Sequence, residues 1–594
     1  MRVDIEQTAG AATAARHVRP PRPRSPERPR IDRFELGVLA AFSAVSLWVL
    51  ALDLWHVIAG GWSWTGTDGV FIVDQLQYLA WIRDASHHLL VSNLFVLGHT
   101  PADYFQPAVA ISGGLTALGV APAVSLLLWK PVAVGAIFFV VRLYVHRSVE
   151  GIWARRAGLV LALFFGSFTV VYGKWTVLGD LFPGFLSWGY VFALLGLALM
   201  AGMVLIYDRA WTQGRISLWP GLLGAIASLL HPWNGELAIA VLLGTELLIR
   251  LGSRQRRAAP GRTDGGVMPR LESLRQRTLS VGSRRRVGAS SRSFSPENRA
   301  SRVEQRLSSY VAYLRPAPGF ALPLVTAVAT GLPLLYYAVL GRTDLSWELA
   351  RGASKHSYPL WSIFLAVAPL LVPAVLGYRK RPQTFLAAAT RVWPLAAVVI
   401  YVVSASAVGA TPLHAFQGIT IPLAILAVQG AQVAGWRRLP HGRLLAIVAV
   451  LVLTVPTTFD ELKVARNLAA PTAGNANFVT HDEARALDYL ASSRAVGGVL
   501  TEPYLGSAVP GITGRRTYVG DCLWSEPNCY GRTLLTQNLF GGSMPAQAAR
   551  SFVLGTSARF VLADCQASAN LPKLLGPIVE SSRRFGCAAV YTVK

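Results

Sequence analysis

Long apolar runs recur along this sequence, and they limit the folds open to the chain more than any other feature. The first occupies residues 34–58, ELGVLAAFSAVSLWVLALDLWHVIA. A helix of about 20 apolar residues is long enough to cross a hydrocarbon layer of ~30 Å. Hydrophobic residues make up 53% of the chain and charged residues only 15%, so a soluble fold could not cover the apolar surface. The sequence therefore predicts a polytopic α-helical membrane protein.

The positions of Arg and Lys predict how the chain is threaded through the membrane. The apolar runs indicate about eleven spans, and basic residues gather at alternate connections, such as Arg379–Arg381. Because cytoplasmic loops carry the excess of Arg and Lys, the N-terminus is expected inside and the chain after the last span outside. The expected spans are residues 34–58, 121–145, 157–172, 185–207, 217–230, 237–251, 318–340, 360–378, 392–409, 418–435 and 443–458.

The basic charge does not indicate a nucleic-acid partner. The formal net charge is +25, but the cations lie at the ends of apolar runs and in one Arg-rich insert. Such cations orient spans and attract anionic lipid head groups. We therefore expect membrane lipid as a partner and no nucleic acid.

Two polar segments lack the composition of a packed core. Residues 1–33 are rich in Arg and Pro, and residues 252–316 are rich in Arg, Ser and Gly. We expect a disordered cytoplasmic tail and a disordered cytoplasmic insert. The insert interrupts a transmembrane domain that is expected to cover residues 34–458. The first outer loop of this domain, residues 60–107, is long and carries acidic, aromatic and histidine residues.

The last segment, residues 459–594, is expected to be an extracytoplasmic α/β domain. All four cysteines, Cys522, Cys529, Cys565 and Cys587, lie in it, and disulfides persist in oxidising compartments. Four cysteines allow three pairings, and sequence proximity favours Cys522–Cys529 and Cys565–Cys587.

Local patterns in that segment alternate between helix and strand. A capping box at Thr480 predicts the start of a helix. Runs rich in β-forming residues predict strands at residues 497–503, 515–520, 558–564 and 588–594. This alternation is typical of a small α/β unit.

Acidic residues of the first outer loop are the leading candidates for chemistry. Asp74 precedes QLQYLAWIRD, in which Leu76, Leu79 and Ile82 share one face. Asp74 is therefore expected at the N-cap or in the first turn of a helix on the membrane surface. A capping role and a catalytic role both stay open for Asp74, and Asp68 is its nearest rival.

Polar residues at the outer ends of other apolar runs form a second group of candidates. Ionisable groups there are costly unless they face a cavity. His231 and Glu236 flank a break beside Pro232, and the basic members of the group could bind a phosphate. A snorkelling lysine, a satisfied turn or a solvated loop would explain them equally well. The group comprises Lys174, Asp180, His231, Glu236, Arg351, Lys355 and His356, with His414 a weaker member.

Common motifs of soluble enzymes are absent from the sequence. It contains no phosphate-binding P-loop, no GxSxG serine motif and no HExxH or CxxC metal motif. No residue is assigned as a metal ligand. A divalent metal ion stays open as a cofactor.

In architecture the chain resembles the GT-C glycosyltransferases. These enzymes have many spans, a long first outer loop with an acidic residue and surface helices, and often an outer C-terminal domain. The acidic residue here would be Asp74 within FIVDQLQYLAWIRDA, with Asp68 as a second. The first loop has no adjacent acidic pair and the C-terminal segment has no WWD-type motif, so the chain departs from the commoner forms.

The resemblance implies a bacterial cell-membrane hexosyl- or pentosyltransferase. Its donor would be a polyprenyl-phosphate-linked sugar, and its acceptor a hydroxyl of an envelope glycan, lipid or protein. Asp74 would act as general base in an inverting reaction, and cations would stabilise the leaving phosphate. A transporter or flippase of lipid-linked glycans and a non-catalytic envelope-assembly protein are the alternatives. A transporter would more often show ionisable residues in mid-span and a repeated half.

Overall fold

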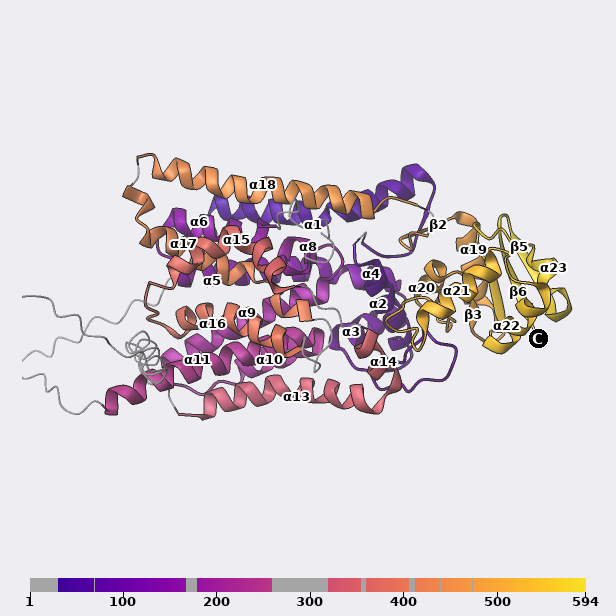
Figure 1. Ribbon diagram of the computed structural model, residues 1–594, viewed down its shortest axis with the longest axis horizontal. Helices are drawn as coiled ribbons and strands as arrows, with labels where there is room; N and C mark the ends of the chain where they lie inside the picture. Colours follow the sequence, from indigo (N-terminus) through magenta and orange to yellow (C-terminus); the bar gives the residue numbers. More distant parts are fainter. Residues whose placement is uncertain are drawn as a thin grey trace, which may run out of the picture.

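The computed structural model describes residues 30–68, 70–166, 179–258, 319–353, 359–404, 412–438, 440–472 and 474–594. The molecule is elongated, with a bundle of long helices at one end and a small α/β domain, which carries the C-terminus, at the other (Figure 1). Short helices lie between these two parts. They are α2 (Ile72–Ala85), α3 (Pro107–Ala117), α4 (Pro122–Leu127) and α14 (Leu345–Ala353).

Eight helices in the described part of the chain are long and apolar enough to cross a membrane. They are α1 (Arg33–Gly60), α4 with α5 (Trp129–Ser148), α9 (Val191–Gln213), α13 (Ala321–Thr343), α15 (Leu360–Gly377), α16 (Phe385–Val403), η4 (Pro412–Phe416) with α17 (Thr420–Val433), and α18 (Gly442–Leu468). The remaining expected spans overlap α6 (Ile152–Phe164), α10 (Trp219–Leu230) and α11 (Pro232–Ala258). Every expected span therefore coincides at least in part with a helix.

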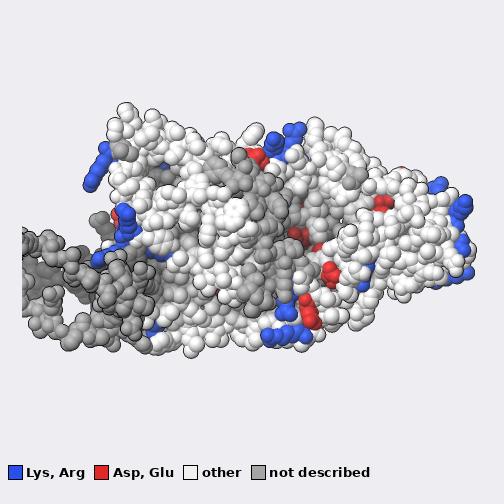
Figure 2. Space-filling model, viewed as in Figure 1, with Lys and Arg blue, Asp and Glu red and all other residues white. Residues whose placement is uncertain are grey.

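The sides of the bundle are apolar. Lys, Arg, Asp and Glu are sparse on the flanks of the bundle and gather toward its ends and on the C-terminal domain (Figure 2). Large hydrophobic side chains are exposed on the outer helices, for example Leu332 on α13 and Leu451 on α18. Such a surface is stable against lipid but not against water, so the chain is built as a membrane protein.

The C-terminal domain contains a four-stranded sheet in the order β3-β4-β6-β5. β3 and β4 are parallel, and the other neighbours are antiparallel. The strands are β3 (Val499–Leu500), β4 (Phe560–Ala563), β5 (Val579–Phe585) and β6 (Ala588–Val593). The helices are α19 (His481–Ser492), α20 (Pro503–Thr513), α21 (Cys529–Phe540), α22 (Ala546–Thr556) and α23 (Leu571–Leu575).

Local predictions for this domain were mostly confirmed. Thr480 and Glu483 form the reciprocal capping box that begins α19. Three of the expected strands correspond to β3, β4 and β6. The strand expected at residues 515–520 is wrong, because that segment makes only an isolated bridge between Thr517 and Val499. The Arg515 side chain there donates to the carbonyls of Leu490, in the last turn of α19, and of Ala495, just after it.

The sequence did not reveal β5. Its central residues, SSRR, are polar and exposed, so they lack the alternation that marks a half-buried strand. Pairing with the buried strand β6 holds β5 at the edge of the sheet.

The first outer loop is clamped between the bundle and the C-terminal domain. Its β1 (Ser63–Trp64) pairs antiparallel with β2 (Phe478–Val479), which lies just before α19. The Asn93 side chain donates to the Trp524 carbonyl (2.8 Å), and the backbone amide of Thr517 donates to Leu94 (3.0 Å). Rings from both parts also meet here, with Trp81 and Trp524 centroids 5.3 Å apart. The loop is therefore part of a rigid interface.

Candidate active site

Asp74 lies in the first turn of α2, as the sequence predicted. The N-cap residue is Phe71, which has a left-handed backbone (φ 55°) and makes no side-chain capping bond. Its ring instead stacks on Tyr190, with centroids 5.1 Å apart. Asp74 is therefore not the N-cap residue, and its carboxylate interacts with its own backbone amide in the first turn.

The surroundings of Asp74 raise the pKa of its carboxyl group. Burial raises the pKa of Asp74 most, and the negative charge of Asp180 raises it further. The charge of His414 acts in the opposite direction, and the pKa is about 6. A carboxylate with such a pKa is a better proton acceptor than an exposed aspartate, whose pKa is near 3.9.

Two short 3-10 helices bring Asp180 and His414 together. Asp180 lies in η2 (Gly179–Leu181), which is followed by α8 (Pro183–Leu186), and His414 lies in η4. His414 Nε2 and Asp180 Oδ2 are 3.2 Å apart. The amide of Gly418, just after η4, donates to the Leu181 carbonyl (3.0 Å). Gly418 has φ 67°, and a Cβ there would collide with Leu197, so glycine is needed for this contact.

A break between α10 and α11 places His231 next to His414. A residue before proline disfavours helical geometry, so α10 ends at His231 in an extended conformation, and α11 begins at Pro232. The His231 and His414 ring centroids are 5.1 Å apart. Tyr190 lies beside both, at 5.5 Å from His231 and 6.0 Å from His414. Asp180 and both histidines thus come from three separate segments.

Several buried polar atoms around this group have no hydrogen-bond partner among the described residues. Buried polar atoms in proteins are nearly always bonded, and leaving one unpaired costs about 1–3 kcal/mol. A cluster of them indicates a place built to contact a polar ligand or water. The atoms are Asp180 Oδ1, His231 Nδ1, Asn234 Oδ1, His414 Nδ1, and Gln417 Oε1 and Nε2.

The C-terminal domain contributes an acid that the sequence did not single out. Asp521 is 5% exposed, and its Oδ1 accepts from the Leu523 amide at 2.8 Å. Burial raises the pKa of Asp521 to about 8, and the charge of Asp74 contributes to the shift. Asp521 is therefore protonated at neutral pH and faces the charge of Asp74. No local sequence pattern could have indicated this approach, because only the docking of the domain creates it.

Asp68 is in a different environment. It is 1% exposed and forms an ion pair with Lys130 of α5. Its backbone amide donates to the Gln75 side chain (2.7 Å), which lies next to Asp74. This pairing ties the first outer loop to the bundle close to the start of α2.

Two of the remaining predicted residues are exposed. Glu236 is exposed on α11, and Arg351 is exposed on α14. Lys174, Lys355 and His356 lie outside the described residues. The structure therefore brings Asp74, Asp180 and His231 together from the predicted set, and it adds Tyr190, Gln417 and the weaker candidate His414.

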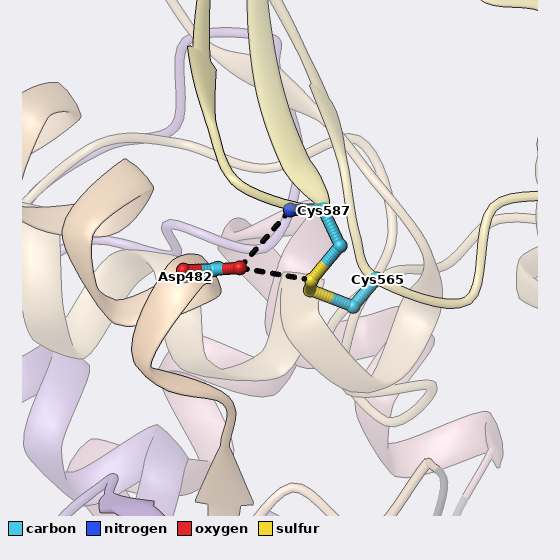
Figure 3. Close-up of side chains that lie close together, drawn as sticks. All are labelled: Asp482, Cys565 and Cys587. Carbon is cyan, nitrogen blue, oxygen red and sulfur yellow. Dashed lines mark hydrogen bonds between the residues drawn. A yellow bond between two sulfur atoms is a disulfide. The ribbon is translucent and has the colours of Figure 1, made fainter.

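The cysteines form the two pairs that sequence proximity favoured, Cys522–Cys529 and Cys565–Cys587. Asp482 lies against the second pair, where its Oδ2 accepts from the Cys587 amide at 3.0 Å (Figure 3). Among the described residues, this is where three His, Cys, Asp or Glu ligand atoms come within 4.8 Å of one another. Because both sulfurs are in a disulfide, they are not thiolates, and this group is not a metal centre.

Comparison with known proteins supports the fold. No protein-family model and no curated protein sequence matches the chain. Among solved structures, the oligosaccharyltransferase of Archaeoglobus fulgidus, tethered to an acceptor peptide with an NVT sequon, is similar. Its TM-score is 0.51 at 13% identity, covering 94% of this chain and 74% of that chain.

A second structure from that organism gives the same result. AglB in complex with an inhibitory peptide and a dolichol-phosphate has a TM-score of 0.50 at 13% identity. The match covers 90% of this chain and 70% of that chain. The chain therefore shares the fold of these structures. This confirms the predicted helical membrane architecture with a C-terminal α/β domain.

Proposed function

We propose that this protein is a membrane glycosyltransferase that moves a sugar from a polyprenyl-phosphate donor to a hydroxyl of an envelope glycan, lipid or protein. The observation that carries the proposal is the position of Asp74. Its carboxylate lies in the first turn of a helix between the bundle and the C-terminal domain, near Asp180 and His414, and Asp74 is not the N-cap residue of that helix. The GT-C-like fold supports this assignment.

In the proposed reaction Asp74 acts as the general base. The acceptor hydroxyl loses its proton to Asp74 while its oxygen attacks the anomeric carbon, and the bond from that carbon to the phosphate oxygen breaks. Attack opposite the leaving phosphate inverts the anomeric configuration. With a pKa of about 6, Asp74 is mostly ionised at neutral pH and still holds a proton well enough to assist the step.

The leaving phosphate needs positive charge and hydrogen-bond donors. We assign this role to His231 and to the predicted cations Lys174, Arg351, Lys355 and His356. The unpaired Asp180 Oδ1 and His414 Nδ1 are atoms of the types that can be ligands of a divalent cation. Such a cation, when bound, would supply further positive charge. Asp68 acts as a positioning residue through Lys130 and Gln75.

The proposed setting is a bacterial cell membrane with the C-terminal domain outside. The two disulfides support an oxidising location for this domain. Because α2 packs against α20 of that domain, Asp74 is proposed to work on the same side.

The direct test is sugar transfer from polyprenyl-phosphate-linked sugars by the purified full chain. Wild type is compared with Asp74→Asn and with Asp488→Asn, a matched change at an exposed position of α19. We expect transfer by wild type and by Asp488→Asn, and a loss of about 10²–10⁴-fold in Asp74→Asn. Full activity of Asp74→Asn would refute the base assignment, and no transfer by wild type from any such donor would refute the proposed function.

A further inference from the structure

A cavity of about 440 Å³ opens in the C-terminal domain. This volume falls within the range of about 300–1,000 Å³ that is typical of small-molecule sites. Its lining includes Glu502, Tyr504, Gln537, Phe540, Asp564 and Gln566. None of these residues takes part in the chemistry proposed for Asp74.

The topology of the sheet explains why acidic side chains meet at this cavity. β3 and β4 are parallel neighbours. Glu502 lies two residues after the end of β3, and Asp564 directly follows β4. The crevice beyond the carboxyl ends of parallel strands is a common ligand position in α/β folds. Here α20, which begins at Pro503, forms part of its wall.

The Asp564 carboxylate can still accept a hydrogen bond from a ligand. Its side chain is 2% exposed, and its Oδ1 accepts from the Gln566 amide at 3.2 Å. Its Oδ2 is buried and makes no hydrogen bond of normal geometry among the described residues, while the Tyr504 hydroxyl and the Ala567 amide lie near the carboxylate. A buried carboxylate oxygen without a donor is costly, and a ligand that donates a hydrogen bond would remove this cost.

The second acid has mixed hydrogen-bonding character. Burial raises the pKa of Glu502 to about 7, and the charge of Asp564 contributes. Near neutral pH Glu502 is therefore present both as a donor and as an acceptor.

The frame around the cavity is held in place before any ligand binds. The disulfide from Cys565 to Cys587 fixes the end of β4 next to Asp564 (Figure 3). The Cys565 amide donates to Glu483 Oε1 (3.0 Å), and the Tyr504 hydroxyl donates to the same oxygen (2.9 Å). Preorganisation of this kind favours a binding site because little ordering is needed on binding.

The residue types select the ligand class. Among the described residues that line the cavity none is Lys, Arg or His, so an anionic phosphate or carboxylate would be repelled. Exposed amides at the rim, Gln537 and Gln566, both donate and accept. The ring of Tyr504 offers an apolar face beside these polar groups. Carboxylates, amides and an aromatic ring together suit the hydroxyls and C–H faces of a carbohydrate.

We propose that this cavity binds a carbohydrate and holds the acceptor glycan during transfer. The acceptor role rests on the proposed function, whereas carbohydrate binding does not. In this arrangement the C-terminal domain, which also carries Asp521 toward Asp74, would hold one part of the glycan while another part reaches the base.

The test is binding of the fluorescently labelled full chain in detergent to an array of mannose, arabinose, galactose and glucose oligosaccharides. Retained oligosaccharides are then titrated against wild type and variants. We expect Asp564→Asn to weaken binding roughly tenfold or more, because a charged acceptor is lost. A double variant at the rim, Gln537→Ala together with Gln566→Ala, leaves the buried residues around the cavity unchanged and should also weaken oligosaccharide binding. Asp488→Asn should bind as wild type does.

The outcomes separate this proposal from the proposed function. Oligosaccharide binding that is lost in both cavity variants, together with a raised KM for the acceptor and an unchanged kcat, would support it. Binding without any sugar transfer would refute the glycosyltransferase but leave the carbohydrate site. No retention of any oligosaccharide by wild type, equal binding by Asp564→Asn and the rim variant, or selective binding of Ca²⁺ or Mn²⁺ in place of sugar would overturn the proposal.

Discussion

Asp74 should determine the acid side of the pH–rate profile of sugar transfer. The base form of Asp74 is the carboxylate, and it is lost as the pH falls through the pKa of about 6. Because burial and Asp180 raise this pKa above its ordinary value of 3.8, the rate should fall at a higher pH than for an exposed aspartate. The direction follows from the sign of the shift, since protonation removes the base.

The size of the effect follows from the same pKa. At pH 7 about nine in ten Asp74 side chains are ionised, and at pH 5 about one in ten. We therefore expect kcat/KM to fall about tenfold between these pH values. An aspartate that titrated at 3.8 would stay about 94% ionised at pH 5 and would give almost no change.

The assay is initial-rate transfer from a polyprenyl-phosphate-linked sugar, measured from pH 4.5 to pH 8 with the full chain in one detergent. Asp74→Asn should lose about 10²–10⁴-fold in rate, and its residual rate should lack the acid limb. Asp488→Asn should reproduce the wild-type profile and so exclude a general effect of the substitution. A wild-type rate that is flat down to pH 5, or an Asp74→Asn variant that keeps the acid limb, would refute the argument.

Three further changes test other parts of the structure. His414→Gln removes a charge that lowers the pKa of Asp74, so the acid limb should move to higher pH; an unchanged limb would contradict the proximity of these groups. Lys130→Met leaves the Asp68 carboxylate buried without its cation. It should lower the free energy of unfolding by about 3–5 kcal/mol, seen as a lower melting temperature that the added change Asp68→Asn largely restores. An unaltered melting temperature would show that the ion pair is not needed. The disulfide between Cys565 and Cys587 joins residues 22 positions apart. Replacing both cysteines with serine should lower the free energy of unfolding of the C-terminal domain by about 3 kcal/mol. If the C-terminal domain resists protease equally well with and without this disulfide, the predicted loss of stability is wrong.

The helical membrane architecture could be predicted from the sequence because its cause is local. A run of apolar residues determines whether a segment suits lipid, whatever its neighbours are. This is why residues 34–58 and the later runs all coincide with helices. The capping box at Thr480 was also predictable, since its two partners lie three residues apart.

The candidate site was only partly predictable. His231 could be recognised because a proline follows it directly, and Asp74 because a helical pattern follows it. The partnership of Asp180 with His414 could not be seen, since 234 positions separate them and each residue alone resembles an ordinary loop residue. Tyr190 and Gln417 carried no signal at all.

The sequence by itself therefore determined that this is a membrane-embedded helical chain with a disulfide-bonded α/β domain, because hydropathy, caps and cysteine proximity act over short distances. Only the tertiary structure decided which acids have shifted pKa values and which polar atoms stay unpaired. Those properties depend on burial and on charges brought from distant segments, as when the docked C-terminal domain carries Asp521 toward Asp74. Packing also separated Asp68 from Asp74, since only one of these two acids of the first loop meets a buried lysine.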